Sequence, residues 1–198
     1  MKELILSTAL RLFVDESFEG TTMRRIADEI EYTPGAIYSY FKDKDEICYA
    51  LHHLGFEKLN AMTAEALSTV TDVVERLRVV GQTYIRFAFE NRALYDLMFI
   101  SRKTGKKIVE SNEWEPGMRA YGTLRETVQA FVAKFKLDWD VDVTAFGCWS
   151  AVHGMVSLVI CDRCTPMPVD HVQVVGLAYE QYVTVMHSAA RRARRAGH

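Results

Sequence analysis

The sequence predicts an all-α protein of about nine helices, in which a small N-terminal bundle of three helices precedes a larger helical domain. Three observations predict this fold class. Apolar residues recur at intervals of three and four along almost the whole chain, which is the spacing of one helix face. Residues 21–44, TTMRRIADEIEYTPGAIYSYFKDK, contain two short periodic segments around a turn. No segment alternates apolar and polar residues strongly enough to indicate a strand.

The first helix is expected to run from the start of the chain to about residue 14. Its apolar stripe consists of Ile5, Ala9, Leu12 and Phe13. The second helix follows Thr21 or Thr22, since either hydroxyl suits an N-cap. Its apolar face has the spacing i, i+3, i+4, i+7 and consists of Met23, Ile26, Ala27 and Ile30.

The third helix is expected to start at Thr33 and Pro34, an N-cap residue followed by proline at the first helical position. Ile37 and Phe41 lie four residues apart and face inward, which turns the intervening aromatic residues, Tyr38 and Tyr40, toward solvent.

The larger domain begins with a helix that Asp43 caps, with Glu46 three residues on as in a capping box. Helical periodicity then predicts elements over about 70–90, 92–100, 116–135, 140–162 and 168–192. A polar loop, SRKTGKK, follows the second of these, and TPMP separates the last two. We place the domain boundary between residues 1–48 and 49–198.

Composition narrows the class of protein. Almost half of the residues are hydrophobic, 49%, which suffices for a folded core. No apolar run reaches the roughly 18 residues of a membrane span, and the first residues lack a cleavage site, so a cytoplasmic protein without a membrane partner is expected. The net charge is −2, which argues against nucleic-acid binding driven by bulk charge.

The second and third helices of the bundle have the features of a helix-turn-helix. The third helix exposes small, hydroxyl-bearing and aromatic side chains, which a helix needs if it is to lie in the major groove of double-stranded DNA. The objection is electrostatic: residues 1–50 contain six Lys and Arg against ten Asp and Glu. DNA binding therefore requires that the few cations and the helix N-termini share one face.

The block from Ile5 to Leu51 resembles the TetR family of bacterial transcriptional regulators. The resemblance rests on TTMRRIA and on TPGAIYSYFKDK, which fits the family pattern [ST]-x-G-x-[IL]-Y-x-[HY]-F-x-x-K. A second segment, WSAVHGMVSL from Trp149 to Leu158, resembles the WHG-type C-terminal domain of one subgroup. The resemblance implies a DNA-binding domain followed by a ligand-binding and dimerisation domain.

The resemblance also implies roles for single residues. Thr22, Thr33, Tyr38, Tyr40 and Lys44 would contact phosphates and set the register on DNA. Pro34 starts the reading helix, and Gly35 and Ala36 would let it approach the bases closely. Two further cations admit two interpretations, as clamps on the DNA backbone or as partners of Asp28 and Glu29 one turn later, namely Arg24 and Arg25.

Two departures from the family pattern concern helix ends. The family usually has glycine near Ser17 and near Glu31, where the backbone is often left-handed. A residue other than glycine raises the energy of such a position by roughly 1–2 kcal/mol. These turns therefore either differ in geometry or hold strain.

Aromatic and methionine residues on the later helices suggest a chamber for a small apolar or aromatic effector. The expected lining is Phe87, Tyr95, Phe99, Trp114, Met118, Tyr121, Trp149 and His153. The alternative interpretation is that these side chains are ordinary core. His153 would either hydrogen-bond the effector or support its own helix.

The function predicted is a ligand-responsive repressor that binds a palindromic operator as a homodimer, without a cofactor or metal and without catalytic residues. The last two helices would pair across the two-fold axis through Ala145, Gly147, Ala151, Gly154, Val175, Ala178, Tyr182 and Val185. Three alternatives remain: an all-α enzyme that uses His153, a thiol sensor that uses Cys161 and Cys164, and a DNA domain that has lost its function.

Overall fold

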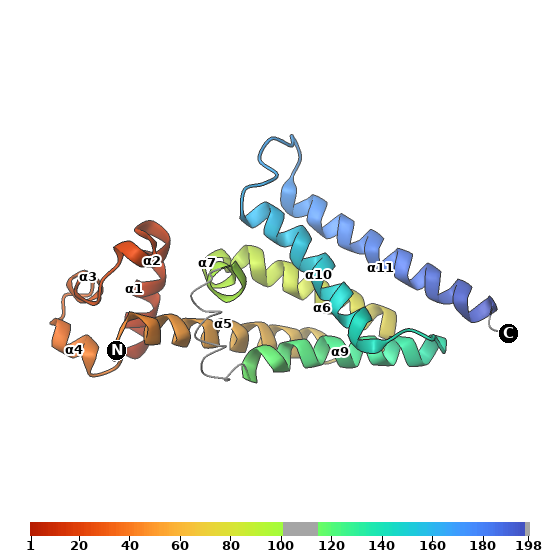
Figure 1. Ribbon diagram of the computed structural model, residues 1–198, viewed down its shortest axis with the longest axis horizontal. Coiled ribbons are helices and arrows are strands. Elements are labelled where there is room, and N and C mark those ends of the chain that lie inside the picture. Colours follow the sequence, from red (N-terminus) through yellow and green to blue (C-terminus); the bar gives the residue numbers. More distant parts are fainter. Residues whose placement is uncertain (101–114, 197–198) are drawn as a thin grey trace. The chain divides into compact units, whose positions relative to one another are not determined.

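The structure, a computed structural model, describes residues 1–100 and 115–196. Within these ranges the chain forms ten α-helices and one π-helical segment, η1, with no strand, which confirms the all-α class (Figure 1). The helices are α1 Lys2–Asp15, α2 Ser17–Gly20, α3 Met23–Glu29, α4 Pro34–Tyr38, α5 Lys44–Leu67, α6 Val73–Glu90, α7 Arg92–Tyr95, η1 Asp96–Ile100, α9 Glu115–Phe135, α10 Val141–Ile160 and α11 His171–Ala196.

The chain divides into two compact units. The first unit comprises residues 1–57 with 91–114, and the second comprises residues 58–90 with 115–198. Helix α5 contributes residues to both. The functional boundary expected after residue 48 stays a prediction, because compactness and function need not divide a chain at the same place.

The core of the first unit forms where the predicted apolar stripes meet. Ile5, Ala9, Ile26 and Ile37 are completely buried, and Leu12 is 1% exposed. Helix α1 packs on α2, α3 and α7, and α3 packs on α4. The short helices α3 and α4 are therefore held by the apolar residues on their inner faces, since helices this short are unstable alone.

Two threonines cap these short helices as the sequence predicted. The Thr22 hydroxyl accepts a hydrogen bond of 3.0 Å from the Arg25 backbone N–H. The Thr33 hydroxyl accepts one of 3.4 Å from the Ala36 N–H, and Pro34 follows at the first helical position. The caps fix where each helix begins and hence which side chains α4 exposes.

The two helix ends without the family's glycine do have left-handed backbones. Ser17 has a φ of 67° and Glu31 a φ of 59°. After α3, the Tyr32 N–H donates to the Ala27 carbonyl and the Glu31 N–H donates to the Asp28 carbonyl, which is a Schellman motif. Of the two possibilities left open by the sequence, the strained backbone is the one observed.

In the second unit, α6, α9, α10 and α11 pack against one another (Figure 1). Helices α6 and α11 approach most closely at Gly81, where an added Cβ would lie 1.9 Å from Cζ of Tyr179. The Tyr179 hydroxyl donates a 2.9 Å hydrogen bond to the Leu77 carbonyl. A glycine on α6 therefore provides the space for a buried tyrosine on α11.

Two of the eight residues predicted to form the dimer face of α10 and α11 are buried, while Gly147 and Val185 of the same set are exposed. Ala145 is completely buried and Val175 is 4% exposed, so neither lies on an outer face. The large apolar residues that are exposed there are Val143, Phe146, Leu158, Val172, Val174, Leu177 and Val185. Helix α10 is apolar on both faces, which explains why periodicity placed Ala145 on the outer one. By length and composition, α10 is also the one helix in the described ranges that could cross a membrane, and 28% of its apolar stretch is buried inside the protein.

Some predicted elements start or end elsewhere. The helix expected over 92–100 is α7 followed by the π-helical η1, and the short α2 was not predicted. Helix α6 starts at Val73 because Asp72 accepts hydrogen bonds from the N–H groups of Val74 and Glu75. The loop expected at residues 101–107 lies outside the described residues.

Candidate nucleic-acid interface

Helix α4 presents one outer face while its inner face is fixed. Ile37 is completely buried and Phe41, just beyond the helix, is 2% exposed. Between and beside these anchors, Tyr38 is 55% exposed and Tyr40 is 47% exposed. An aromatic residue exposed to this degree is not part of the core, so the outward orientation expected for both tyrosines is observed.

The start of α4 is small and accessible. Thr33 and Gly35 are exposed, and Pro34 and Ala36 are partly exposed. A Cβ added at Gly35 would meet only the Thr33 hydroxyl, at 3.9 Å. The fold itself therefore does not require glycine here, whereas a ligand that approaches the backbone closely would.

Lys44 has an internal role at the start of α5. Its ammonium donates a 2.7 Å hydrogen bond to the Thr21 carbonyl and another to the Phe18 carbonyl. The same group lies 4.2 Å from the centroid of the Phe18 ring. Lys44 thus ties α5 to the segment between α2 and α3, and any phosphate contact would compete with these partners.

Arg25 is likewise engaged within the unit. Its guanidinium lies 2.8 Å from the Glu16 carboxylate and 2.6 Å from that of Glu29, and Glu29 also pairs with Arg11. Hydrogen bonds to Glu29 and Glu16 raise the pKa of Arg25 above its ordinary value. Hydrogen bonds from Arg11 and Arg25 lower the pKa of Glu29. This network connects α1, the residue between α1 and α2, and α3.

Arg24 differs from its neighbour. Its side chain is 82% exposed, and the distance from its Nε to the Asp28 carboxylate is 3.9 Å, which is the limit of an ion pair. A loose, exposed pair of this kind is worth little. Arg24 is therefore the more available of the two arginines for a phosphate.

The carboxylates that make residues 1–50 acidic are partly engaged in structure. Glu16 and Glu29 face arginines. Asp43 accepts a hydrogen bond from the Glu46 N–H, and Glu46 accepts one from the Lys42 N–H. The net charge of this segment therefore overstates the negative charge near the outer face of α4.

Lys42 is a candidate that the sequence reasoning missed. Lys42 is exposed and lies two positions beyond Tyr40. Its ammonium group forms no ion pair with an acidic side chain in the described ranges. The sequence did contain a signal for it: in Tyr40-Phe41-Lys42 the apolar Phe41 was expected to face inward, which places Lys42 on the opposite, outward side. We add Lys42 to the candidate interface.

The aromatic residues predicted to line a chamber fall into two groups. In the first unit, the ring centroids of Tyr95 and Phe99 are 5.0 Å apart, and Phe99 is 5.3 Å from Phe56. In the second unit, Trp149 is 6.0 Å from Tyr121 and 6.2 Å from His153.

The remaining predicted lining residues are less alike. Phe87 is completely buried, as a core residue is. Met118 is 55% exposed, and Trp114 lies outside the described residues. In the second-unit group the aromatic rings lie beside a predicted residue with a polar function.

That polar function is His153. Its Nδ1 lies 3.1 Å from the Tyr84 hydroxyl, and burial lowers its pKa from the ordinary value. A neutral imidazole beside a tyrosine and a tryptophan can donate or accept one hydrogen bond, according to its tautomer.

The thiols and acids form no metal site in the described ranges, where no three His, Cys, Asp or Glu side chains gather suitably. None of the four cysteines, all of which are in the described ranges, forms a disulfide: Cys161 and Cys164 are partly exposed, whereas Cys48 and Cys148 are buried. The thiol-sensor alternative stays a prediction. Replacing Cys161 and Cys164 by serine would remove it if the response to oxidant were unchanged.

Two family models match the chain. Residues 5–51 match the tetR family of bacterial regulatory proteins, and residues 77–194 match the tetracyclin repressor-like C-terminal domain. Together these segments include the candidate interface and all the described helices from α9 to α11.

Curated relatives match over shorter segments. The transcriptional activator FasR of Mycolicibacterium smegmatis is 28% identical over 95 residues, which are 48% of this chain and 43% of FasR. The transcriptional regulator HbdR of an Aromatoleum species is 33% identical over 73 residues, or 37% of this chain and 32% of HbdR. The chain thus spans less than half the length of these relatives.

Solved structures share the fold over nearly the whole chain. FadR from Bacillus subtilis, in complex with stearoyl-CoA, has a TM-score of 0.75 at 16% identity and covers 92% of this chain and 98% of its own. The TetR family regulator PfmR from Thermus thermophilus has a TM-score of 0.70 at 23% identity and covers 91% and 97%. From the two matching models and the helix-turn-helix they include, the chain is a member of the TetR family, a transcriptional regulator rather than an enzyme.

Proposed function

We propose that this protein is a ligand-responsive repressor that binds a palindromic DNA operator as a homodimer and is released by a small apolar or aromatic effector. The observation that carries the proposal is the outer face of α4 and of the turn after it, where Tyr38 and Tyr40 are about half exposed while Ile37 and Phe41 are buried. Family membership supports the DNA-binding part.

In this proposal α4 lies in the major groove with its N-terminus toward the bases. Gly35 and Ala36 allow a close approach, and the hydroxyls of Thr22, Thr33, Tyr38 and Tyr40 contact phosphates. Arg24 and Lys42 are the cations best suited to add phosphate contacts. Arg25 and Lys44 mainly hold the reading helices in position.

The homodimer would form through α10 and α11. On their outer faces, Phe146 is 60%, Leu177 is 58% and Val185 is 64% exposed. Nearby Gly147 and Gly154 have room around them, since a Cβ added to either meets nothing within 4 Å. Exposed large apolar side chains on two neighbouring helices are typical of an interface, and a two-fold pair of such helices makes a four-helix bundle. Two copies of α4 would then read two half-sites about one DNA turn apart.

The effector site that we favour is formed by the side chains of His153, Trp149, Tyr121 and Tyr84. The rings would contact an apolar or aromatic molecule, and the imidazole would hydrogen-bond its polar group. FadR, which holds stearoyl-CoA, indicates that the shared fold accommodates a ligand with a long apolar chain. The effector would shift the population toward a state with weak operator affinity, by no more than its difference in affinity between the two states.

The test of the proposal is binding to the DNA that flanks the protein's own gene, measured across a salt series. Site-specific binding whose log K falls linearly with log salt is the expected result. Tyr40→Ala should weaken binding without changing the slope. Arg24→Ala should reduce the slope by about one, as loss of one phosphate contact does. Arg192→Ala, an exposed arginine on α11, is the control.

Two results would contradict the proposal. Absence of site-specific binding at low salt, both alone and with cell extract as a source of ligand, would mean that the DNA domain has lost its function. Unchanged affinity in Tyr40→Ala and Arg24→Ala would mean that neither α3 nor the segment after α4 contacts DNA as proposed. Leu177→Glu examines the dimer separately: light scattering should report a monomer, and operator affinity should fall with it.

A further inference from the structure

A cleft of about 770 Å³ opens in the second unit, away from the aromatic group around His153. It is lined by the start of α6, the end of α9 and the last turns of α11. Its volume falls within the range of small-molecule sites, about 300–1,000 Å³. Nothing in the proposed operator or effector binding involves this cleft, and the inference drawn from it does not depend on that function.

One wall of the cleft is a stripe of basic side chains on α11. His187, Arg191, Arg194 and Arg195 all line it, and their spacing of three and four residues sets them on one helix face. The three arginines are exposed, and none pairs with an acidic side chain in the described part of the chain. Like charges at this spacing repel one another, so an anion between them would be stabilising.

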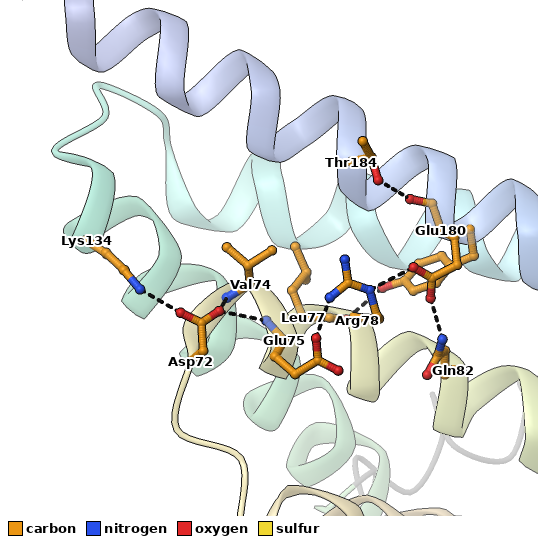
Figure 2. A network of polar contacts seen from close by, with 10 residues as sticks. Asp72, Val74, Glu75, Leu77, Arg78, Gln82, Lys134, Glu180 and Thr184 are labelled. Atoms are coloured by element: carbon orange, nitrogen blue, oxygen red, sulfur yellow. Dashed lines mark hydrogen bonds and ion pairs between the residues drawn. The ribbon is translucent and has the colours of Figure 1, made fainter.

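The opposite wall contains cations whose charge is already offset. Figure 2 shows Lys134 paired with Asp72 at 2.7 Å, and Arg78 held between Glu75 and Glu180. The Lys134 hydrogen bond lowers the pKa of Asp72, and the hydrogen bond to Glu180 raises the pKa of Arg78. These pairs are internal to the unit. The positive charge left for a ligand therefore belongs to the α11 stripe.

The cleft also has an aromatic edge. The partly exposed ring of His187 lies 5.3 Å, between centroids, from that of Phe135, which is 6% exposed at the end of α9 and supports it from below. Val74 adds an apolar side chain. The planar ring of a ligand can pack against these side chains while a charged group on the same ligand reaches the arginines. A guanidinium group donates two parallel hydrogen bonds to two oxygens of one phosphate.

Favourable interaction with the helix dipole accounts for some cations in the last turn of α11. It does not account for Arg191, which lies a turn earlier. Nor does it explain why the arginines lie on the one face of α11 that lines the cleft. Arg192 is the internal comparison: it is equally exposed and sits on the same helix, but it does not line the cleft.

We propose that this cleft binds a nucleoside polyphosphate, with the phosphates between Arg191, Arg194 and Arg195 and the base against Phe135 and His187. The base and the phosphate chain are both needed: the arginines recognise the charge, and the aromatic edge distinguishes a nucleotide from an inorganic polyphosphate.

The experiment is calorimetric titration of the full-length protein with ATP and with GTP at low salt, alongside adenosine and inorganic tripolyphosphate. A nucleoside triphosphate should bind more tightly than tripolyphosphate or adenosine. Arg191→Ala combined with Arg195→Ala should weaken it about tenfold or more, since two charge-assisted hydrogen bonds are lost. Arg192→Ala should leave the affinity unchanged within about twofold, a difference well below one such bond. These surface changes lie at a helix end, and unchanged thermal unfolding checks that each variant folds.

Three outcomes would overturn the proposal. No heat of binding with either nucleotide means that the cleft has no such ligand. Equal affinity for ATP and tripolyphosphate means that the stripe attracts any polyanion, including DNA or an acidic protein, without recognising a base. Equal loss of affinity in Arg192→Ala means that the net charge of α11, and not the cleft, is responsible.

Discussion

The two units place their charged and apolar groups differently. In the first, Arg25 lies between two carboxylates and Lys44 is bound by two backbone carbonyls. In the second, a glycine on α6 accommodates a buried tyrosine from α11, and three arginines at the end of α11 have no acidic partner in the described residues. The number of cations in a segment therefore does not measure its capacity to bind an anion.

The comparison explains how an acidic segment can include a DNA-reading helix. Cations near α3 hold short helices together, so the reading face must depend on hydroxyls, on small residues and on a few exposed cations. The second unit has long helices that pack through apolar surface, and its paired charges join the ends and edges of these helices, as Arg78 with Glu180 and Lys134 with Asp72 do. The predictions that follow test this contrast, beginning with the largest expected effect.

Gly81→Ala should destabilise the second unit by about 3 kcal/mol, near the upper end for overpacking in a core. The added Cβ would lie 1.9 Å from Cζ of Tyr179 and 2.2 Å from its hydroxyl oxygen. Chemical denaturation followed by circular dichroism measures the change. Gly122→Ala is the matched control, because its Cβ would meet nothing within 4 Å and alanine favours the helix by up to about 1 kcal/mol. Equal effects of the two substitutions would contradict the close approach of α6 and α11.

Lys44→Met should destabilise the first unit by about 2 kcal/mol, since the carbonyls of Phe18 and Thr21 lose a charged donor. Lys42→Met is the matched control for charge and should leave stability nearly unchanged while weakening DNA binding. Urea unfolding and operator affinity are measured on both. If Lys44→Met lowered operator affinity with no loss of stability, Lys44 would be a phosphate contact and not a structural tie.

Glu31→Gly should stabilise the protein by about 0.5–1 kcal/mol, because glycine relieves the left-handed backbone but loses more entropy on folding. The φ of 59° at Glu31 is the reason for the gain. Glu31→Ala removes the carboxylate and keeps the Cβ, so no gain is expected from it. Thermal unfolding compares the two variants. A similar gain in both would attribute the effect to charge and not to backbone conformation.

Local rules predicted the parts of the fold that short segments determine. The caps at Thr22 and Thr33, the proline at the start of α4 and the inward turn of Ile37 depend on neighbours within four residues. The partners of Lys44 could not be predicted, since they are backbone carbonyls that tertiary packing brings near.

The burial of single residues on the later helices could not be predicted for the same physical reason. Periodicity identifies an apolar stripe but not the helix that covers it. Phe87 and Met118 looked alike in sequence, yet one is completely buried and the other is 55% exposed. Ala145 was assigned to the outer face and is buried, because a helix that is apolar all round gives no local indication of which side meets the core.

The smallest expected effect concerns acid. The pKa of Glu29 lies below its ordinary value of 4.5 because Arg11 and Arg25 donate hydrogen bonds to the carboxylate. A carboxylate with a lowered pKa in the folded state contributes stability that is present above its unfolded pKa and is lost as the pH falls through the folded value. Glu29→Gln should therefore flatten the stability profile below pH 4.5 and leave the slope above it unchanged. The effect is small because the pair is open to solvent and screened.

Asp142→Asn, which removes the corresponding pair with Arg125 in the second unit, should flatten the same acid region. If only Glu29→Gln flattened it, the linked pairs of Arg11, Arg25, Glu16 and Glu29 would respond to acid as one cooperative unit. The two units would then differ in their response to acid as well as in their use of cations.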